Sequence, residues 1–236
     1  MRLAVVAAAV AGTAACAPEP AGEQGAAVKD LYDVFFYVAA GVFVVVAGLI
    51  GWSIVRFRKK PGDDAEPPQF GHNLALEITW FALPTVIVVV LFVLSAGALQ
   101  DVNDEEAAPV VTVRVEAFQW GWRFAYEGEA VAIEGLPEDP ARIVLPVDEP
   151  VRFDLRSRDV VHSFYVPRFL IKRDTIPGET NRIDYVIREE GTYDGKCAEF
   201  CGVLHDRMPF TIEAVPVEEF ERWLDDQRTE NEDAGI

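Results

Sequence analysis

Two uninterrupted runs of uncharged, mostly apolar residues constrain this chain more than any other feature of its sequence. Residues 34–55 and residues 78–99 each contain 22 residues and no charged side chain. At about 1.5 Å per residue, each run forms a helix roughly 33 Å long, enough to cross the hydrocarbon core of a bilayer. A helix buried inside a soluble protein is the alternative, and two such runs in one chain argue against it. We therefore expect a transmembrane helical hairpin.

Basic residues beside the first run give the hairpin a direction. Four of them follow the run directly, whereas the flank before it has only Lys29 against four acids. The four are Arg56, Arg58, Lys59 and Lys60. Because basic flanks stay in the cytoplasm, residues 56–77 are expected to form a cytoplasmic loop. The N-terminal segment and the long C-terminal part then lie on the outer face of a bacterial plasma membrane.

The N-terminus has the pattern of an export signal. Met1 and Arg2 are followed by an Ala- and Val-rich stretch that ends in small residues before Cys16. A basic start, an apolar stretch and small residues are typical of a secretory signal peptide, to which we assign residues 1–16. Cys16 stands where a bacterial lipoprotein carries its lipidated cysteine, and an ordinary signal peptide with an incidental cysteine is the open alternative. Residues 17–33 are interpreted as an outer linker, because their first part is rich in Ala, Gly, Pro and Glu.

Charge is distributed unevenly along the chain. The sequence has 39 acidic and 21 basic residues and a net charge of −18, of which −16 falls in residues 101–236. This balance argues against nucleic-acid binding, because contacts to phosphate need a basic surface. A basic protein partner is expected instead, with solubility alone as the other explanation of the acidic surplus. Three cysteines are too few for a multi-disulfide scaffold.

From Pro109 onward the pattern changes to short β-strands separated by turn residues. Apolar runs of β type occupy residues 110–115, 141–147, 151–155, 181–186 and 210–215. Many short strands with Pro, Gly and Asp breaks predict a Greek-key barrel or sandwich over residues 109–215. Residues 216–236 form an acidic tail. Its residues 217–226 are expected to be a short amphipathic helix, with Phe220, Trp223 and Leu224 on one side and frayed residues after Gln227.

Five aromatic residues recur at every second position after the first β-type run. They are Phe118, Trp120, Trp122, Phe124 and Tyr126. A period of two places alternate side chains on one face of a strand, so this pattern predicts one aromatic face. Core packing is the better interpretation for Phe118, Trp122 and Phe124. For Trp120 the periodicity leaves packing and function equally open.

The segment with the clearest chemistry is residues 197–208. Cys197, Cys201, His205 and Met208 place two thiols, an imidazole and a thioether within twelve residues. Soft sulfur ligands together with imidazole select copper or zinc, and a weak axial thioether indicates copper in electron transfer. A mononuclear blue-copper site needs one cysteine, so this loop has one too many. Two thiolates on one loop can instead bridge two copper ions.

Each copper ion of such a pair needs an imidazole and a weak axial ligand. The chain has three histidines, of which His205 serves one ion. His72 falls on the cytoplasmic side in the topology above, so His162, in the outer domain, is the candidate for the other. Met208 is one candidate axial ligand, and a backbone carbonyl of the loop, most simply that of Glu199, is the other.

These residues resemble subunit II of the haem–copper cytochrome c oxidases. The ligand loop of that family has the form C-x-E-x-C-x-x-x-H-x-x-M, and residues 197–208 match every fixed position. Other parts of the family pattern match residues 159–164 around the first histidine, residues 172–178, residues 119–124 and the Glu-x-x-Trp at residues 77–80. The resemblance covers about residues 30–215. It implies two transmembrane helices, a cupredoxin-like domain with a dinuclear CuA centre, and electron transfer in a respiratory chain.

The resemblance also implies individual roles. Cys197 and Cys201 resemble the bridging thiolates, His162 and His205 the terminal imidazoles, and Met208 the axial thioether. Glu199 resembles the residue whose carbonyl binds copper and whose carboxylate binds a Mg²⁺ or Mn²⁺ ion shared with subunit I. Trp120 resembles the surface tryptophan that receives electrons from a c-type cytochrome, and Glu77 the carboxylate at the mouth of a proton channel in subunit I. A role of Glu77 in starting a helix is the alternative.

The resulting hypothesis is a subunit of a proton-translocating terminal oxidase, whose oxygen-reducing haem site lies in another subunit. Acidic residues near the ligands or Trp120 are candidates for docking the donor cytochrome, namely Asp159, Asp174, Asp206 and Glu127. A membrane-tethered single-copper carrier, a copper-delivery factor and a copper-free structural subunit are the alternatives. A disulfide between Cys197 and Cys201 is the alternative state of the two thiols, and it leaves His205 and Met208 unexplained.

Overall fold

The computed structural model describes residues 18–59, 61, 62, 66, 68–105 and 108–234, with side chains as far as Glu230. The assigned signal peptide and Cys16 therefore lie outside the described residues. The chain divides into two compact units. One contains Asp30–Leu99, and the other contains residues 100–236 together with the described residues before Asp30. Each unit is described by itself below.

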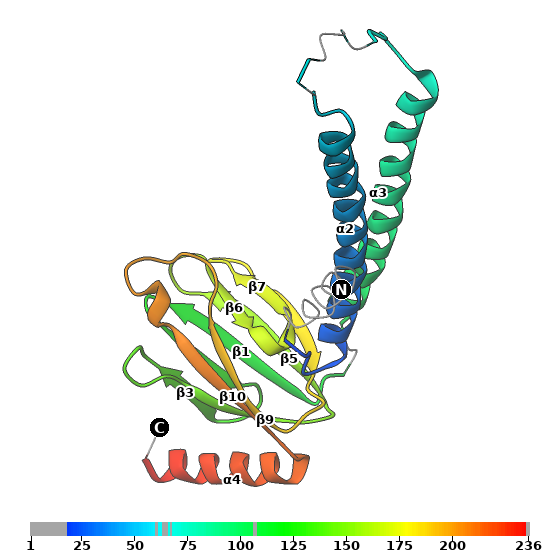
Figure 1. The fold of residues 1–236 in the computed structure, drawn as a ribbon. Coiled ribbons are helices and arrows are strands. Elements are labelled where there is room, and N and C mark those ends of the chain that lie inside the picture. Colours follow the sequence, from blue (N-terminus) through cyan, green and yellow to red (C-terminus); the bar gives the residue numbers. More distant parts are fainter. Residues whose placement is uncertain (1–17, 60, 63–65, 67, 106–107, 235–236) are drawn as a thin grey trace, which may run out of the picture. The chain divides into compact units, whose positions relative to one another are not determined.

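The first unit is a helical hairpin made from α2 (Glu23–Arg56) and α3 (Leu74–Asn103), whose first and last turns belong to the other unit (Figure 1). The two helices contain both of the uncharged runs. All of α3 is described, and none of its residues is buried. Phe43 on α2 and Phe92 on α3 are each 71% exposed. An all-round apolar helix surface is stable in a bilayer rather than in water. Both helices are long and apolar enough to cross a membrane.

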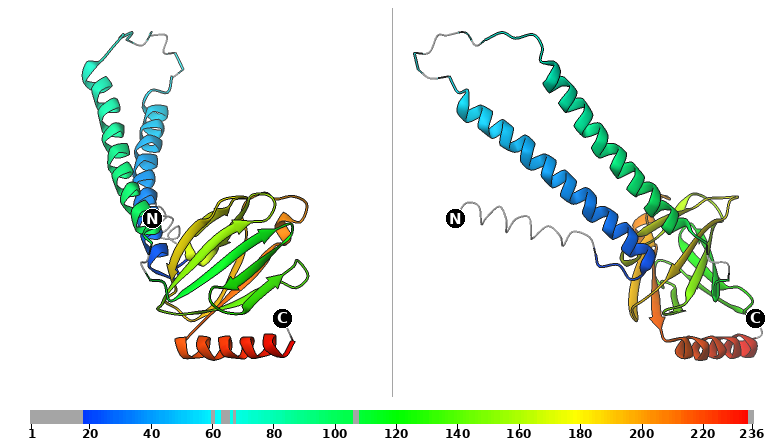
Figure 2. Two further views of the ribbon diagram at one scale, coloured as in Figure 1. Left: turned by 180° about the vertical axis from the view of Figure 1, so that it is seen from behind. Right: turned by 90° about the vertical axis from the view of Figure 1, so that its right-hand side faces the viewer.

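The second unit is a sandwich of two five-stranded sheets, which face each other in Figures 1 and 2. One sheet has the order β3-β2-β1-β5-β8 and the other β4-β10-β9-β6-β7. The strands are β1 (Val111–Phe118), β2 (Gly121–Tyr126), β3 (Val131–Gly135), β4 (Arg142–Pro146), β5 (Pro150–Ser157), β6 (His162–Val166), β7 (Ile171–Thr175), β8 (Asn181–Val186), β9 (Gly191–Cys197) and β10 (Pro209–Val215). β1 pairs with β5 in parallel, and so does β4 with β10. The expected fold class, a two-helix hairpin followed by an all-β domain, is confirmed as a sandwich.

The prediction of one aromatic face over five alternating residues is wrong in its first part. A turn at Gln119 and Trp120 ends β1 and starts β2, so the alternation runs across a chain reversal. Trp122, Phe124 and Tyr126 are buried on β2 as expected, whereas Phe118 and Trp120 are only half-buried. The period of two therefore holds for β2 alone.

Aromatic rings fill the space between the sheets beside β9. The ring of Phe210 lies 5.3 Å from that of Trp122 and 4.9 Å from that of Phe164, measured between centroids. Gly195 on β9 makes this packing possible, because a Cβ atom there would lie 2.1 Å from the Phe210 ring. The strand that ends in Cys197 thus rests directly on an aromatic core.

The interpretation of residues 17–33 as a loose linker is wrong for its described part. Ala21 is fully buried, its N–H donates to the carbonyl of Arg168 (2.8 Å), and its own carbonyl accepts from the N–H of Arg188 (2.8 Å). Gly22 forms a bridge with Ile187, and α2 begins at the next residue. This short segment adds backbone hydrogen bonds just beyond the end of β8. The pairing joins residues far apart in the sequence, so no local pattern predicts it.

The acidic tail is more ordered than the sequence predicts. Helix α4 covers Val217–Ala234 instead of residues 217–226 (Figure 1). Phe220 and Leu224 are buried, and the ring of Trp223 lies 5.3 Å from that of Tyr126. The expected fraying after Gln227 is wrong, because Arg228 is held by ion pairs to Glu129 on the sandwich and to Asp225.

Candidate metal centre

The ends of neighbouring strands bring the candidate ligands together. β6 begins with His162, β9 ends with Cys197, and the two strands pair next to these residues. The loop after β9 carries Cys201, a short 3-10 helix (His205–Arg207) carries His205, and Met208 directly precedes β10. One residue from β6, one from the end of β9 and three from the segment between β9 and β10 therefore meet at one end of the sheet.

The distances between these side chains are short. The sulfur atoms of Cys197 and Cys201 lie 3.8 Å apart, and both cysteines are free. His162 Nδ1 lies 3.9 Å from the Cys197 sulfur, and His205 Nδ1 lies 3.7 Å from the Cys201 sulfur. The Met208 sulfur is 3.4 Å from that of Cys201. The ligand atoms of His162, Cys197 and Cys201 all lie within 4.8 Å of one another.

A backbone oxygen completes the donor set. The carbonyl oxygen of Glu199 lies 3.2 Å from the Cys197 sulfur. All six residues that the sequence singles out as metal ligands therefore surround one small volume. His162 is fully buried, and Cys197, Cys201 and Met208 are at most 5% exposed, whereas His205 is half-buried. The site is screened from water on most sides and more accessible at His205.

The pair of thiols has strongly divided proton affinities. Burial opposes ionisation of Cys197, but hydrogen bonds from His162 and from backbone groups outweigh it and lower the pKa of Cys197 to about 6. Burial and the neighbouring Cys197 raise the pKa of Cys201 to about 12. Burial also disfavours a charged His162, yet the contacts with Cys197 and Asp159 outweigh it and raise the pKa of His162. The site thus favours a thiolate at Cys197 beside a thiol at Cys201.

The donor set fits a pair of soft metal ions. Copper in electron-transfer sites takes cysteine, imidazole, thioether and carbonyl donors. The cluster offers all four types, with the two cysteine sulfurs close enough to bind the same metal ions. The sulfur of Met208 argues against a structural zinc site, which is built from cysteine and histidine alone. The close approach of both imidazoles to different sulfurs also supports two ions more than one.

Contacts behind the ligands fix their positions. The indole N–H of Trp122 donates to the carbonyl of Met208 (3.0 Å). Asp159 accepts a hydrogen bond from the ring Nε2 of His162 (2.9 Å). Sequence reasoning had placed Trp122 in the core and Asp159 among the docking candidates, and neither prediction included these contacts. The spacing of Asp159, three residues before His162, is the local signal from which the second contact could have been predicted.

Trp120 lies at the edge of the site. It is half-buried, and its indole N–H donates to the carbonyl of Cys201 at 3.3 Å. Gly202 makes room for it, because a Cβ atom on Gly202 would lie 3.0 Å from the indole and its φ of +120° is rare for other residues. The tryptophan that the sequence left open between packing and function is therefore in contact with the ligand loop.

The carboxylate of Glu199 belongs to a small group of ion pairs. It forms an ion pair with Lys172 (3.2 Å), which also pairs with Asp174 (2.9 Å). Asp174 is thus partly neutralised, as is Glu127 through Arg114 (2.7 Å). Of the four docking candidates, only Asp206 is exposed without such an ion pair among the described residues.

Glu77 lies in the helical unit, at the start of α3. Its carboxylate accepts the N–H of Asn73 (3.1 Å), and the Asn73 side chain accepts the N–H of Leu76 (3.2 Å). This reciprocal arrangement resembles a capping box with the acidic residue one position further along, and it satisfies free N–H groups at the helix start. The helix-starting alternative for Glu77 therefore has direct structural support.

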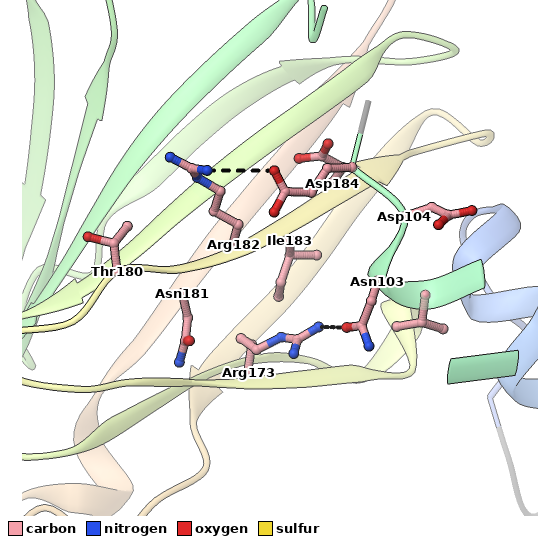
Figure 3. A pocket seen from close by; sticks show the side chains of 10 residues that line it. Asn103, Asp104, Arg173, Thr180, Asn181, Arg182, Ile183 and Asp184 are labelled. Carbon is pink, nitrogen blue, oxygen red and sulfur yellow. Dashed lines mark hydrogen bonds and ion pairs between the residues drawn. The ribbon is translucent and has the colours of Figure 1, made fainter. Parts of the chain in front are cut away.

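A separate polar pocket lies beside the end of α3 (Figure 3). It has a volume of about 280 Å³, and Arg173 donates to Asn103 within it. Arg182 pairs with Glu105 at the same place (3.6 Å). Its described lining residues include no sulfur or imidazole donor, so it is not a second site for a soft metal.

Comparison with known proteins gives consistent matches. Residues 111–215 match the family described as "Cytochrome C oxidase subunit II, periplasmic domain", and residues 16–97 match the corresponding transmembrane domain. A probable cytochrome c oxidase subunit 2 of Streptomyces coelicolor is 34% identical over 89% of this chain and 77% of its own length. A cytochrome c oxidase subunit 2 of Alkalihalophilus pseudofirmus is 35% identical over 91% of this chain and 63% of its own.

Among solved structures, the periplasmic domain of subunit II of cytochrome oxidase from Bradyrhizobium japonicum is similar. It shares 27% identity with this chain and has a TM-score of 0.49. The match covers 52% of this chain and 96% of that domain.

Proposed function

Because the chain belongs to the cytochrome c oxidase subunit II family, we propose that it is the electron-accepting subunit of a respiratory terminal oxidase. The observation that carries this proposal is the cluster of Cys197, Cys201, His162, His205 and Met208 around one small buried volume. A subunit that had lost its electron-transfer role would have no need for two free thiols facing two imidazoles and a thioether. The copper-free structural alternative is therefore disfavoured.

In this proposal six residues hold a dinuclear copper centre: His162, Cys197, Cys201, His205 and Met208 through side chains, and Glu199 through its carbonyl. When bound, the copper pair supplies one-electron chemistry, taking electrons from a c-type cytochrome and delivering them to haem in subunit I, where oxygen is reduced to water. The chain's own part is to hold the ligands in place. A rigid β-scaffold keeps their positions nearly the same in both redox states, which lowers the reorganisation energy of electron transfer. Burial of the sulfurs keeps water and other ligands away.

Trp120 is proposed to receive electrons from the donor cytochrome. Its half-buried ring and its hydrogen bond to the Cys201 carbonyl support this role, because they connect the protein surface to the ligand loop. The acidic surplus of residues 101–236 would steer a basic cytochrome toward this surface, with an association rate that falls as salt rises.

The remaining roles rest on the resemblance. The copper domain is proposed to face outward from a bacterial plasma membrane, with residues 56–77 in the cytoplasm. The Glu199 carboxylate is proposed to bind Mg²⁺ or Mn²⁺ together with subunit I, in which case it must leave its ion pair with Lys172 or share it. Glu77 is proposed to stand at the mouth of the proton channel, in addition to its capping role.

The decisive experiment is copper quantification with electron paramagnetic resonance on the full chain in detergent. We expect two copper ions per chain and a signal from one unpaired electron shared over both nuclei. One copper per chain would favour a single-copper carrier. Copper that exchanges readily and gives no shared signal would favour a copper-delivery factor.

Two variants separate the roles of individual residues. Met208→Leu should retain copper, shift the redox potential and disturb one nucleus more than the other, and an unchanged potential would contradict an axial role. Trp120→Ala should retain copper and slow reduction by cytochrome c, and normal turnover would remove Trp120 from the electron path.

A further inference from the structure

We propose that Asp159 is a positioning residue that ties the turn carrying Trp120 to the imidazole of His162. The turn consists of Gln119 and Trp120, between β1 and β2. The inference rests on the proposed function, because it takes Trp120 as the electron acceptor and His162 as a copper ligand. It assigns Asp159 an internal task in place of the docking role that its charge suggested.

The first link joins Asp159 to His162. Asp159 Oδ1 lies 2.9 Å from His162 Nε2 and accepts the N–H of Val160 at 2.6 Å. An ionised carboxylate can only accept hydrogen bonds, so the ring hydrogen of His162 is on Nε2. In the neutral ring, Nδ1, which faces the Cys197 sulfur, is then the nitrogen with a free lone pair. Asp159 thereby selects the tautomer and the ring orientation that a metal ligand needs.

The second link joins the same carboxylate to the turn. Asp159 Oδ2 accepts the N–H of Gln119 at 2.6 Å, across 40 residues of sequence. The turn in its own right contacts the ligand loop, because the Gln119 side chain donates to the Cys201 carbonyl (2.7 Å) and so does Trp120 (3.3 Å). The turn is therefore fixed from two sides, by Asp159 and by the carbonyl of Cys201.

The parallel pairing of β1 with β5 explains why Asp159 can reach both partners. Ala117 pairs with Ser157 at the end of the two strands, and the N–H of Arg158 continues the pairing by donating to the Ala117 carbonyl (3.0 Å). Asp159 is the next residue, opposite the turn that follows β1. Its side chain is only 30% exposed, which limits what it can offer to a docking partner.

Asparagine is the informative replacement, because it has the shape of aspartate and only one acceptor oxygen. If that oxygen faces His162, the amide nitrogen opposes the N–H of Gln119. If the oxygen faces Gln119, the amide nitrogen opposes the ring N–H of His162. With Nδ1 on copper the ring hydrogen stays on Nε2, so in the copper-loaded chain Asp159→Asn breaks one of the two links, whichever way the amide turns. Asp159→Ala breaks both.

The experiment compares these variants with Asp194→Asn, which removes the same charge from an exposed position on β9. All are made in the full chain in detergent. The first measurement is amide hydrogen exchange at Gln119 and Trp120 in the copper-loaded chain. The second is the redox potential and paramagnetic spectrum of the copper-loaded chain at equal copper content. Loss of one hydrogen bond predicts exchange about tenfold faster at the turn.

We expect Asp159→Ala to speed exchange at the turn and to shift the potential, and Asp159→Asn to do at least one of these. Asp194→Asn should do neither. If Asp159→Asn behaves like Asp194→Asn in both measurements, the proposal is overturned. It is also overturned if Asp159→Ala changes only one of them, because the carboxylate then does not tie the two sites together. Failure of the unaltered chain to hold a copper pair would instead refute the proposed function, and exchange in the copper-free Asp159→Ala chain would still test the link to the turn.

Discussion

Trp122 is the residue whose replacement best tests how the core supports the site. Its side chain lies between the sheets, 1% exposed, with its ring 5.3 Å from that of Phe210 and 6.4 Å from the imidazole of His162. Its indole N–H donates to the carbonyl of Met208. Trp122→Phe removes this hydrogen bond and part of the ring while keeping an aromatic side chain in place.

The expected cost follows from these contacts. Losing one buried hydrogen bond costs about 1 kcal/mol, because the Met208 carbonyl still accepts the N–H of Cys197 at 3.3 Å. The space left by the smaller ring costs a further ~1–2 kcal/mol. We therefore expect Trp122→Phe to lower the free energy of unfolding of the sandwich by about 2–3 kcal/mol, and its melting temperature by about 10 °C.

Differential scanning calorimetry of the copper-free full chain in detergent measures this change. Trp223→Phe on α4 is the matched control. Its side chain is only partly buried, and its indole makes no hydrogen bond with the residues that the structure describes. The control should cost about 1 kcal/mol or less. Equal melting temperatures for the two variants would refute the argument that the hydrogen bond and the tight packing of Trp122 stabilise the domain.

Two further predictions concern the ligand loop. Gly202→Ala should push the Trp120 indole away from the Cys201 carbonyl and slow reduction by cytochrome c severalfold at unchanged copper content; stopped-flow absorption measures the rate, and an unchanged rate would contradict the contact. The proton balance of the site gives the second. Cys201 keeps its proton near neutral pH, because its pKa is raised to about 12, whereas Cys197, with a pKa lowered to about 6, is already mostly ionised. Copper binding should therefore release about one proton from the two thiols, and its apparent affinity should rise about tenfold per pH unit near pH 7–8. A pH-stat titration that detects no release would contradict this assignment.

Most of the side chains that the structure brings together could be predicted from the sequence, because they are close to one another in the chain. Cys197, Cys201, His205 and Met208 lie on one loop, and their residue types and spacing indicate copper without any knowledge of the fold. His162 lies 35 residues before Cys197, and only the small number of histidines and the family resemblance connected it to the loop. The contacts of Asp159 and Trp122 with the ligands depend on strand pairing and were missed.

Several strands were missed because their burial pattern does not follow their hydrophobicity. β9 contains Gly195, a buried residue without a side chain, whose place in the core is filled by the ring of Phe210. The turn at Gln119 and Trp120 was not predicted, because the alternation of aromatic residues continues unchanged through this reversal of the chain. Gly22 and Ile187 pair although they are far apart in the sequence, so neither segment alone predicts this pairing.

The parallel pairing of β4 with β10 orders events during synthesis of the protein. Residues 142–146 can pair only after residues 211–215 have been synthesised. β10 begins at Pro209, 106 residues after α3 ends at Asn103. At about 5–20 residues per second, the ribosome needs roughly 5–20 s for that interval. The two apolar helices are therefore complete, and free to insert, well before the sheet carrying Cys197 gains its neighbour. The cluster of Cys197, Cys201 and His205 is therefore completed only after both helices have been made, so metal binding there would follow the synthesis of both helices.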